Sequence, residues 1–549
     1  MFKENNQLGL YSFENELPEV VRKRLDRTQE KSFYNLVFRN INERDYKALF
    51  SDKASRPNVP VNILVGSLIL KERKNWSFDE LMEQIMFDLR TKYALGLTSL
   101  ETMPFSRATL FNFQNRVQEY ESETGINLLE LTFDRLTAEQ LAELKIKTSI
   151  QRTDSTLISA NIRRYGRVQL LVETLLRLFR KLEKADKEQL IAAIEPYSKQ
   201  GSEKYIYSLN PGELPHELEK LGKLYHRVLE EVKDKYSKTP EFRMLDRVYK
   251  EHFIVVEGNV TAKANEELGS NILQSPDDED ATFRKKRKEE SRGYTINATE
   301  TAHPDNEVQL LTDVAVNKNN IDDSVILEKR IDRITVKTPD LEEIHTDGGY
   351  GSQAVDKKMS EKTITQITTA VRGKKKSVEI IIEQPCDNGQ KYTVKCPLQT
   401  IESEKTKTRH KAIFDTDKCK GCLLKAECTI YKSSGRYYFT HADYLKNERA
   451  RNILKIPPER RKLRPNVEAV MREFKTKTRA GKLKVRGMFK ASLFAYLMAI
   501  SINFGRIYRL NSQNGNFYYP LLLYLERITY PFSFLIFLNR NKECKLKWA

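Results

Sequence analysis

The chain has 549 residues, more than one compact hydrophobic core usually holds, so its length predicts two or three domains. Its 94 Lys and Arg residues exceed its 76 Asp and Glu residues, and the resulting charge of +18 favours a polyanionic partner such as nucleic acid over a merely solvated basic surface. Six cysteines after a charged rather than apolar start indicate a reducing cytoplasm and argue against disulfides.

The N-terminal part has a helical pattern. From Glu19 to about residue 144 the apolar residues recur at helical spacing, which predicts an all-helical domain over residues 1–144. Within it, Ser77 and Glu80 form the Ser-x-x-Glu pattern that is typical of a helix capping box.

A further helix start is predicted at Ser106. The helix that follows carries Arg107, Asn112, Gln114 and Arg116 and could lie in a DNA groove, with Arg107 and Arg116 as its cationic contacts. An ordinary surface helix explains the same pattern equally well.

Between Lys145 and Ser159 the pattern changes to β-branched residues in near-alternation, which predicts a strand with Asp154 on one face. Helix formers dominate from about 166 to 250, so we expect a helical insertion there. Strand patterns resume in GYTINATETA and VQLLTDVAVN, followed by a helix, a strand that ends at Asp347, and further strands. This order predicts a mixed α/β sheet in which Asp347 begins an open, glycine-rich turn, DGGYG.

Five of the six cysteines fall between about 374 and 438, in a segment that we interpret as a small insert. After it, two helices joined by a basic loop are predicted, with Glu468 on the first. Residues 511–549 form an apolar and basic tail. Glu526, Arg527 and two prolines interrupt its apolar stretch, which favours a buried packing segment over a membrane span.

Three carboxylates in these contexts suit phosphodiester cleavage, which needs an in-line nucleophile, a stabilised leaving oxygen and neutralised phosphate charge. Two Mg²⁺ ions bridged by carboxylates provide all three. Asp154 and Asp347 lie on predicted strands and can converge on one ion, and Glu468 would complete the set from a helix. The chain contains 76 Asp and Glu residues, so three of them alone do not identify a metal site. The sequence around each of the three has to support that interpretation.

That surrounding sequence consists of four ordered blocks: TDSTLISANIRRYGRVQLL; SPDDEDATFRKK with GYTINATETA; HTDGGYGS; and RPNVEAVMREFK with KVRGMFKASLFAYLMAISIN. In order and spacing they resemble the DDE transposases of bacterial insertion sequences, in the branch with a helical N-terminal domain and a cysteine-bearing insert before the catalytic Glu. The resemblance implies an RNase H-like core over residues 145–510. It also implies that Asp154, Asp347 and Glu468 bind two Mg²⁺ or Mn²⁺ ions, and that Arg464 and Lys475 contact the phosphates of the transposon ends.

Basic runs at 284–288, 372–376, 459–464 and 475–487 can each neutralise DNA phosphates. In the last run, the best candidates for holding DNA beside the metal ions are Arg479, Lys482, Lys484 and Arg486. An acidic run from Asp277 to Asp280 could hold a cation, but we favour a solvated loop or helix cap because adjacent side chains diverge in direction.

The cysteines follow the spacing Cys386-x9-Cys396-x22-Cys419-x2-Cys422-x5-Cys428, with His410 nearby. The Cys419-x2-Cys422 pair is a common Zn²⁺ half-site, and if zinc is bound its predicted ligands are Cys396, Cys419, Cys422 and Cys428. Ordinary free thiols fit the spacing as well. A redox role is less favoured, because no thioredoxin-like pattern surrounds the pair.

Together, these observations predict an α/β protein with an RNase H-like mixed sheet, a helical insertion and an all-helical N-terminal DNA-binding domain. The predicted function is a transposase that cuts DNA at transposon ends and joins the freed 3′-OH to target DNA. We expect it to act as a homodimer at the bacterial nucleoid, in the cytoplasm and not at a membrane. The alternatives are a metal-dependent DNA nuclease without joining activity and a catalytically inactive DNA-binding protein.

Overall fold

The structure is a computed structural model, and it describes residues 1–5, 13–51, 53, 57–97, 100, 105–286, 289–368, 378–384 and 391–513. Cys386, the basic run at 372–376, the end of the run at 284–288 and most of the predicted tail at 511–549 lie outside the described residues. The chain divides into two compact units. One contains Met1–Lys147, His303–Leu311 and the chain from Tyr496 on, and the other contains Thr148–Ala302 and Thr312–Ala495.

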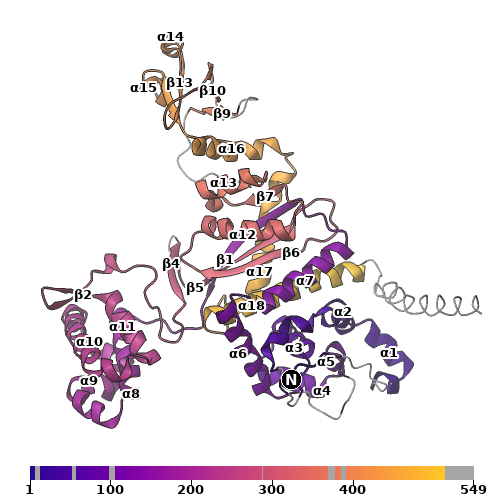
Figure 1. The fold of residues 1–549 in the computed structure, drawn as a ribbon, viewed down its shortest axis with the longest axis vertical. Coiled ribbons are helices and arrows are strands. Elements are labelled where there is room, and N and C mark those ends of the chain that lie inside the picture. The colour runs from indigo at the N-terminus through magenta and orange to yellow at the C-terminus, as the bar shows by residue number, and fades with distance from the viewer. Residues whose placement is uncertain are drawn as a thin grey trace, which may run out of the picture. The chain divides into compact units, whose positions relative to one another are not determined.

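The first unit is built from helices, as the apolar periodicity predicts (Figure 1). They are α1 (Glu19–Asp26), α2 (Gln29–Leu36), α3 (Val61–Lys74), α4 (Phe78–Phe87), α5 (Leu89–Ala94), α6 (Arg107–Thr124) and α7 (Leu128–Glu143). The predicted capping box at the start of α4 is confirmed. The Ser77 hydroxyl accepts from the Glu80 N–H at 3.1 Å, and the Glu80 carboxylate accepts from the Ser77 N–H at 2.6 Å.

The C-terminal part of α18 (Met488–Gln513) belongs to this first unit. Arg73 of α3 donates to the Ser501 carbonyl at 2.9 Å, and its guanidinium lies 4.6 Å from the centre of the Phe504 ring. The unit therefore includes residues that the predicted boundaries at 144 and 510 assign elsewhere. By length and composition α18 could cross a membrane, but 78% of its apolar window is buried within the protein, as in a core helix.

The second unit contains a mixed sheet, which in the described part of the chain has six strands. Its order is β4 (Thr282–Lys286), β5 (Glu289–Thr301), β1 (Ile150–Ser159), β7 (Glu343–Thr346) and β8 (Thr365–Thr368), and β6 (Leu311–Lys318) also pairs with β5. β1 runs antiparallel to β5 and parallel to β7, and β7 runs parallel to β8. The predicted mixed α/β architecture is confirmed, with β1 in the interior of the sheet.

Two helices pack beside this sheet: α12 (Asp323–Lys337) and α13 (Gln353–Glu361) (Figure 1). Buried Leu327, Ile331 and Ile334 of α12 share a hydrophobic cluster with Ile344 of β7 and Val355 of α13. Because these side chains pack on the strand that precedes Asp347, they hold that strand end in place.

Helices also fill the segment in which helix formers predict an insertion. They are α8 (Arg167–Lys181), α9 (Lys184–Ser208), α10 (Leu214–Tyr236) and α11 (Pro240–His252), followed by a hairpin of β2 (Phe253–Val256) and β3 (Asn259–Ala262). Leu171, Tyr197, Tyr225 and Leu245 are fully buried among them, so the insertion has a hydrophobic core of its own.

The cysteine-bearing segment forms two small sheets. One contains β9 (Ile381–Glu383), β10 (Thr393–Lys395) and β11 (Thr400–Glu402), and the other contains β12 (Glu404–Lys405), β13 (His410–Ile413) and β14 (Arg436–Phe439). Two short helices, α14 (Thr416–Lys420) and α15 (Thr429–Lys432), lie between β13 and β14 in the chain. After them, α16 (His441–Lys455), the 3₁₀ turn η8 (Arg464–Asn466) and α17 (Val467–Thr476) lead to the basic loop.

Candidate active site

Two of the predicted carboxylates meet at one edge of the sheet. In the parallel pairing of β1 with β7, Arg152 lies opposite His345. Continuing this register by two residues brings Asp154 beside Asp347, which directly follows β7. The Asp347 side chain accepts a hydrogen bond from the backbone N–H of Gly349, which holds the carboxylate at the start of the turn η6 (Gly348–Tyr350).

Asp154 is nearly buried, with 8% of its surface exposed. Burial raises the pKa of its carboxyl group, and the negative charges of Asp347 and Asp323 raise it further. The Ser155 N–H, which donates to Asp154 at 2.8 Å, and the Arg464 guanidinium act in the opposite direction. The net rise in pKa therefore comes from burial, and the neighbouring carboxylates of Asp347 and Asp323 add to it. Oxygen ligands gathered in this way suit a divalent cation.

Arg464 connects Asp154 with the third predicted carboxylate. Its guanidinium donates to Asp154 Oδ2 at 3.0 Å and to Glu468 Oε1 at 3.4 Å. Arg464 lies in η8 and Glu468 in the first turn of α17, which packs against β1 and β5. The side chain of Glu468 is 67% exposed, so it is the most open of these groups.

The structure thus brings Asp154 and Asp347 together and ties Glu468 to Asp154 through one guanidinium. It does not arrange the three carboxylates around a common point. Among the described residues, no three His, Cys, Asp or Glu side chains stand close enough together to form a complete metal site.

A buried ion pair holds the segment that carries Arg464. Arg152 and Glu300 are direct partners across β1 and β5, and their side chains pair at 2.7 Å with almost no exposed surface. Arg152 also donates to the backbone carbonyl of Leu463 at 2.9 Å, one residue before Arg464. This pair was not predicted from the sequence. Its only sequence signal is that Arg152 lies two residues before Asp154 and therefore on the same face of the strand.

Asp323 is a fourth carboxylate at the site that sequence analysis missed. It is the first residue of α12, and its Oδ1 accepts from the Ser155 hydroxyl at 2.5 Å. Burial raises the pKa of the Tyr350 hydroxyl, and among the nearby charges that of Asp323 contributes most. Asn297 donates to the Tyr350 oxygen at 2.7 Å and to the Asp154 carbonyl at 3.1 Å, which completes a polar network around β1. An acidic residue that begins a helix resembles an ordinary dipole contact, so no local pattern singles out Asp323.

The basic loop after α17 is held against the end of β1. The Ser159 N–H donates to the Gly481 carbonyl at 3.0 Å, and the Leu483 N–H donates to the Ser159 carbonyl at 2.9 Å. Ala480 and Gly481 have φ angles of 52° and 77°, and this left-handed pair closes the tight turn at the tip of the loop.

The predicted DNA contacts in this region differ in their environment. Lys475, Arg479 and Lys484 are exposed. Lys482 Nζ donates to the Ile162 carbonyl at 3.0 Å, and Arg486 Nε donates to the Asn161 carbonyl at 2.7 Å. The side chains of Lys482 and Arg486 therefore help to hold the loop itself.

Comparison with protein families gave two matches, each to part of the chain. A family described as "Transposase DDE domain" matches residues 385–508, which include Glu468 and the basic loop but neither Asp154 nor Asp347. A second, described as "Transposase domain (DUF772)", matches residues 22–116 in the helical N-terminal part. The two matches support a DDE transposase of an insertion sequence. A transposase family implies a DNA substrate, and DDE transposases generally use divalent metal ions such as Mg²⁺. Comparison with curated proteins and with solved structures gave no match.

The acidic run of the transposase caps a helix, in agreement with the favoured interpretation. Asp278 is buried and accepts from the Tyr294 hydroxyl at 2.6 Å and from the Gly487 N–H at 2.9 Å. Asp280 accepts from the N–H of Met488, the first residue of α18, at 3.0 Å. These carboxylates bind N–H groups at the positive end of the helix dipole.

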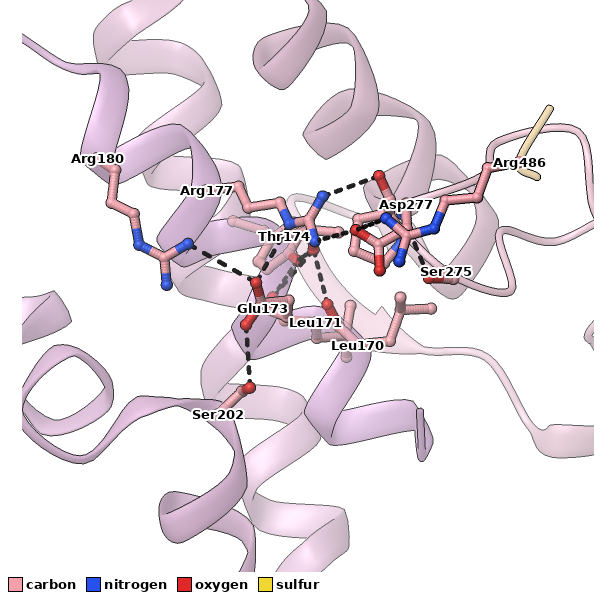
Figure 2. Close-up of polar contacts among 12 residues, drawn as sticks. Leu170, Leu171, Glu173, Thr174, Arg177, Arg180, Ser202, Ser275, Asp277 and Arg486 are labelled. Carbon is pink, nitrogen blue, oxygen red and sulfur yellow. Dashed lines mark hydrogen bonds and ion pairs between the residues drawn. The ribbon is translucent and has the colours of Figure 1, made fainter. Parts of the chain in front are cut away.

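The first residue of the acidic run, Asp277, joins the helical insertion to the basic loop. Figure 2 shows its carboxylate between Arg177 of α8, at 2.7 Å, and Arg486, at 3.7 Å. Glu173 pairs with Arg177 at 3.2 Å and with Arg180 at 3.7 Å on the other side (Figure 2). Arg177 of the insertion thus pairs with Asp277, which also pairs with Arg486 of the basic loop.

The N-terminal helix predicted from Ser106 is α6. Arg107 and Arg116 are exposed, but Arg107 pairs with Asp79 at 2.5 Å, and Arg116 lies over the Phe50 ring at 5.7 Å. Gln114 is buried, so its assignment to a groove-facing surface is wrong, since the same side of α6 packs into the helical core.

Proposed function

We propose that this transposase cleaves DNA at transposon ends and transfers the freed 3′-OH into target DNA. The observation that carries the proposal is the convergence of Asp154 and Asp347 at adjacent strands, with Glu468 linked to Asp154 by the Arg464 guanidinium. The strand order supports an RNase H-like core, because β1 carries Asp154 between an antiparallel neighbour, β5, and a parallel neighbour, β7.

Asp154, Asp347 and Glu468 are the residues that would hold two Mg²⁺ or Mn²⁺ ions. Their hard carboxylate oxygens suit these ions, and Asp347 and Asp323 lie close enough to Asp154 for their charges to act on it. When bound, the ions would neutralise phosphate charge and stabilise the entering and leaving oxygens. Asp323 adds a fourth negative charge beside Asp154 through its bond to Ser155.

The side chains of the transposase position the DNA for two displacements at phosphorus. In the first, a water oxygen bonds to phosphorus, and the bond from phosphorus to the 3′ oxygen breaks, which releases a 3′-OH. In the second, that 3′ oxygen bonds to a phosphorus of target DNA and displaces another 3′ oxygen. Neither step needs a covalent bond between protein and DNA.

Cationic side chains would bind the phosphates during both steps. Arg464 can turn from the carboxylates toward a phosphate of the transposon end, because its side chain is 20% exposed. Lys475, Arg479 and Lys484 are exposed along the same segment and would bind neighbouring phosphates. Lys482 and Arg486 would act mainly by holding the loop.

The remaining features of the proposal concern assembly. The N-terminal domain, over residues 1–144, would bind DNA through exposed cations such as Arg107 and Arg116. Two transposon ends have to be brought together, which favours a homodimer with two-fold symmetry in the working complex. Action on bacterial chromosomal DNA would keep the protein at the nucleoid in the cytoplasm.

The test is a cleavage and joining assay on labelled DNA that carries the terminal repeats of the insertion sequence. Changes to groups that merely orient metal ligands cost about 10- to 100-fold, so Asp154→Asn, Asp347→Asn and Glu468→Gln should each reduce cleavage at least about a hundredfold. Glu473→Gln is the matched control, because it lies on the same helix about 140° away from Glu468 and should cleave normally.

Two outcomes would replace the proposal with another function. If a pre-cleaved end is never joined to target DNA while uncut ends are cleaved, the chain is a nuclease. If the wild-type chain binds DNA in a gel-shift assay but neither cuts nor joins it, the chain is an inactive DNA-binding protein.

A further inference from the structure

The cysteine insert contains a small cavity that the proposed DNA chemistry does not use. Its volume is about 20 Å³, and all four described cysteines line it: Cys396, Cys419, Cys422 and Cys428. A space of this size admits about one water-sized guest. The other lining residues include apolar Val378, Leu398 and Ile430 and the polar residues Gln399, Lys425 and Tyr431.

Three short turns bring these cysteines to the cavity. Cys396 follows β10, and its N–H donates to the Gln399 carbonyl at 2.9 Å. Cys419 lies in α14, and the Cys422 N–H donates back to its carbonyl at 3.1 Å. Cys428 precedes α15 and donates to the Lys425 carbonyl at 3.2 Å. Each turn reverses the chain and presents its cysteine to the same space.

Gln399 connects the loop after β10 with helix α14. Its side-chain amide donates to the Asp415 carbonyl at 3.0 Å and to Cys419 Sγ at 3.3 Å, and its oxygen accepts from the Asp415 N–H at 2.9 Å. The loop after β10 and the helix α14 are therefore fastened to each other beside the thiols.

We propose that Cys396, Cys419, Cys422 and Cys428 bind one structural Zn²⁺ ion. Four thiolates form the closed tetrahedral ligand set that structural zinc prefers, and a reducing compartment keeps them available. His410 is not a ligand. It lies outside the cavity lining and packs against the rings of Tyr392, at 4.6 Å, and Phe439, at 5.4 Å.

Binding has to draw the thiols closer together. In the described part of the chain, no three candidate ligands already stand close enough for a complete site. Cysteine side chains have a single rotatable bond before the sulfur, so rotation within the cavity and small shifts of the three turns can bring the sulfurs inward. Removal of any one thiol leaves an incomplete ligand set.

The zinc ion would stabilise the segment between Cys419 and Cys428, most of which lies outside the hydrophobic cluster of the insert. Leu423 in this segment is 99% exposed. Small units of this kind usually need a metal or disulfides in addition to their core. Zinc would therefore order the segment from Cys419 to Cys428.

The test is the metal content of the full-length, untagged transposase, measured by inductively coupled plasma mass spectrometry after expression in zinc-containing medium. We expect about one zinc per chain. Cys419→Ser and Cys422→Ser should each lose most of this zinc, while Cys386→Ser and Cys544→Ser, which change the other two cysteines of the chain, should retain it.

A spectroscopic measurement on the wild-type protein tests the zinc site even if a cysteine variant does not fold. X-ray absorption of the wild-type protein should give a zinc shell of four sulfurs at about 2.3 Å. Removal of the metal should also accelerate trypsin cleavage at exposed Lys418, Lys420 and Lys425. A wild-type protein that is purified without zinc, or a shell dominated by nitrogen or oxygen, would overturn the proposal. None of these readouts depends on DNA cleavage, so the zinc site and the proposed function can fail separately.

Discussion

The buried pair of Arg152 and Glu300 allows stability and positioning to be separated in one set of variants. Arg152→Met removes the positive charge beside Glu300, a carboxylate with no exposed side-chain surface, and also the donor that binds the Leu463 carbonyl. Removing one partner of a buried ion pair typically costs about 3 to 5 kcal/mol of folding free energy. We therefore expect a large fall in the urea midpoint of the second unit.

The double variant Arg152→Met with Glu300→Met should recover most of that stability. Apolar residues of similar volume often replace a buried ion pair with little net cost, because both desolvated charges are removed together. What the double variant still lacks is the hydrogen bond to the Leu463 carbonyl, which is worth about 1 kcal/mol. The neighbouring Arg464 and Glu468 would then be held less firmly, so DNA cleavage should remain low despite the recovered stability.

The assay combines urea denaturation, followed by circular dichroism, with cleavage of labelled DNA under conditions where each variant is folded. Glu300→Met completes the double-variant cycle and gives the coupling energy of the pair. The reasoning is refuted if the double variant is as unstable as Arg152→Met. It is equally refuted if the double variant cleaves DNA as fast as the wild-type protein, because the contact with Leu463 would then not position α17.

Three further changes test other parts of the structure. Asp323→Asn removes a negative charge from the site, so half-maximal cleavage should need several-fold more Mg²⁺ at unchanged DNA affinity, which a Mg²⁺ titration measures. Burial and two nearby cations lower the pKa of His252 from 6.5 to about 4. In the unfolded chain His252 takes up its proton at a higher pH than in the folded protein, so the free energy of unfolding should fall by about 3 kcal/mol as the pH drops from 6.5 to 4. In the variant His252→Gln the urea midpoint should depend less on pH over this range. Asp280→Ala removes a cap of α18 and should cost about 1 kcal/mol in the same assay, whereas Glu279→Ala should cost almost nothing; equal effects would contradict the capping role.

Local sequence patterns were sufficient for much of the fold. The alternation around Asp154 predicts β1, and the helical periodicity before residue 144 predicts the N-terminal helices. The Ser77 capping box depends only on residues three apart, so it could be predicted in detail. The assignment of α18 from Tyr496 on to the N-terminal unit could not be predicted, because it depends on contacts such as that between Arg73 and Ser501, which are distant in sequence.

The polar contacts of the candidate site were harder to predict than its elements. Gln114 and Arg486 have the residue types of DNA contacts, but Gln114 is buried in the helical core, and Arg486, although half exposed, pairs with Asp277. These contacts depend on residues distant in sequence, so no local pattern predicts them. Asp323 illustrates the converse, because its role depends on where the start of α12 meets β1, and no spacing within α12 records that position.

Arg152 and Arg464 are the same residue type, but their different burial gives them different roles. Arg152 is enclosed between Glu300 and the Leu463 carbonyl. If the Arg152 side chain moved away, both of these buried acceptors would lose their hydrogen-bond donor. Arg464 is more exposed and divides its guanidinium between two carboxylates, one of them at 3.4 Å and largely in solvent. A phosphate at the site can therefore compete for Arg464 but not for Arg152. As Arg464 turns to the phosphate, Asp154 and Glu468 lose their shared cation and their affinity for a divalent ion rises, so the binding of DNA and of metal should reinforce each other.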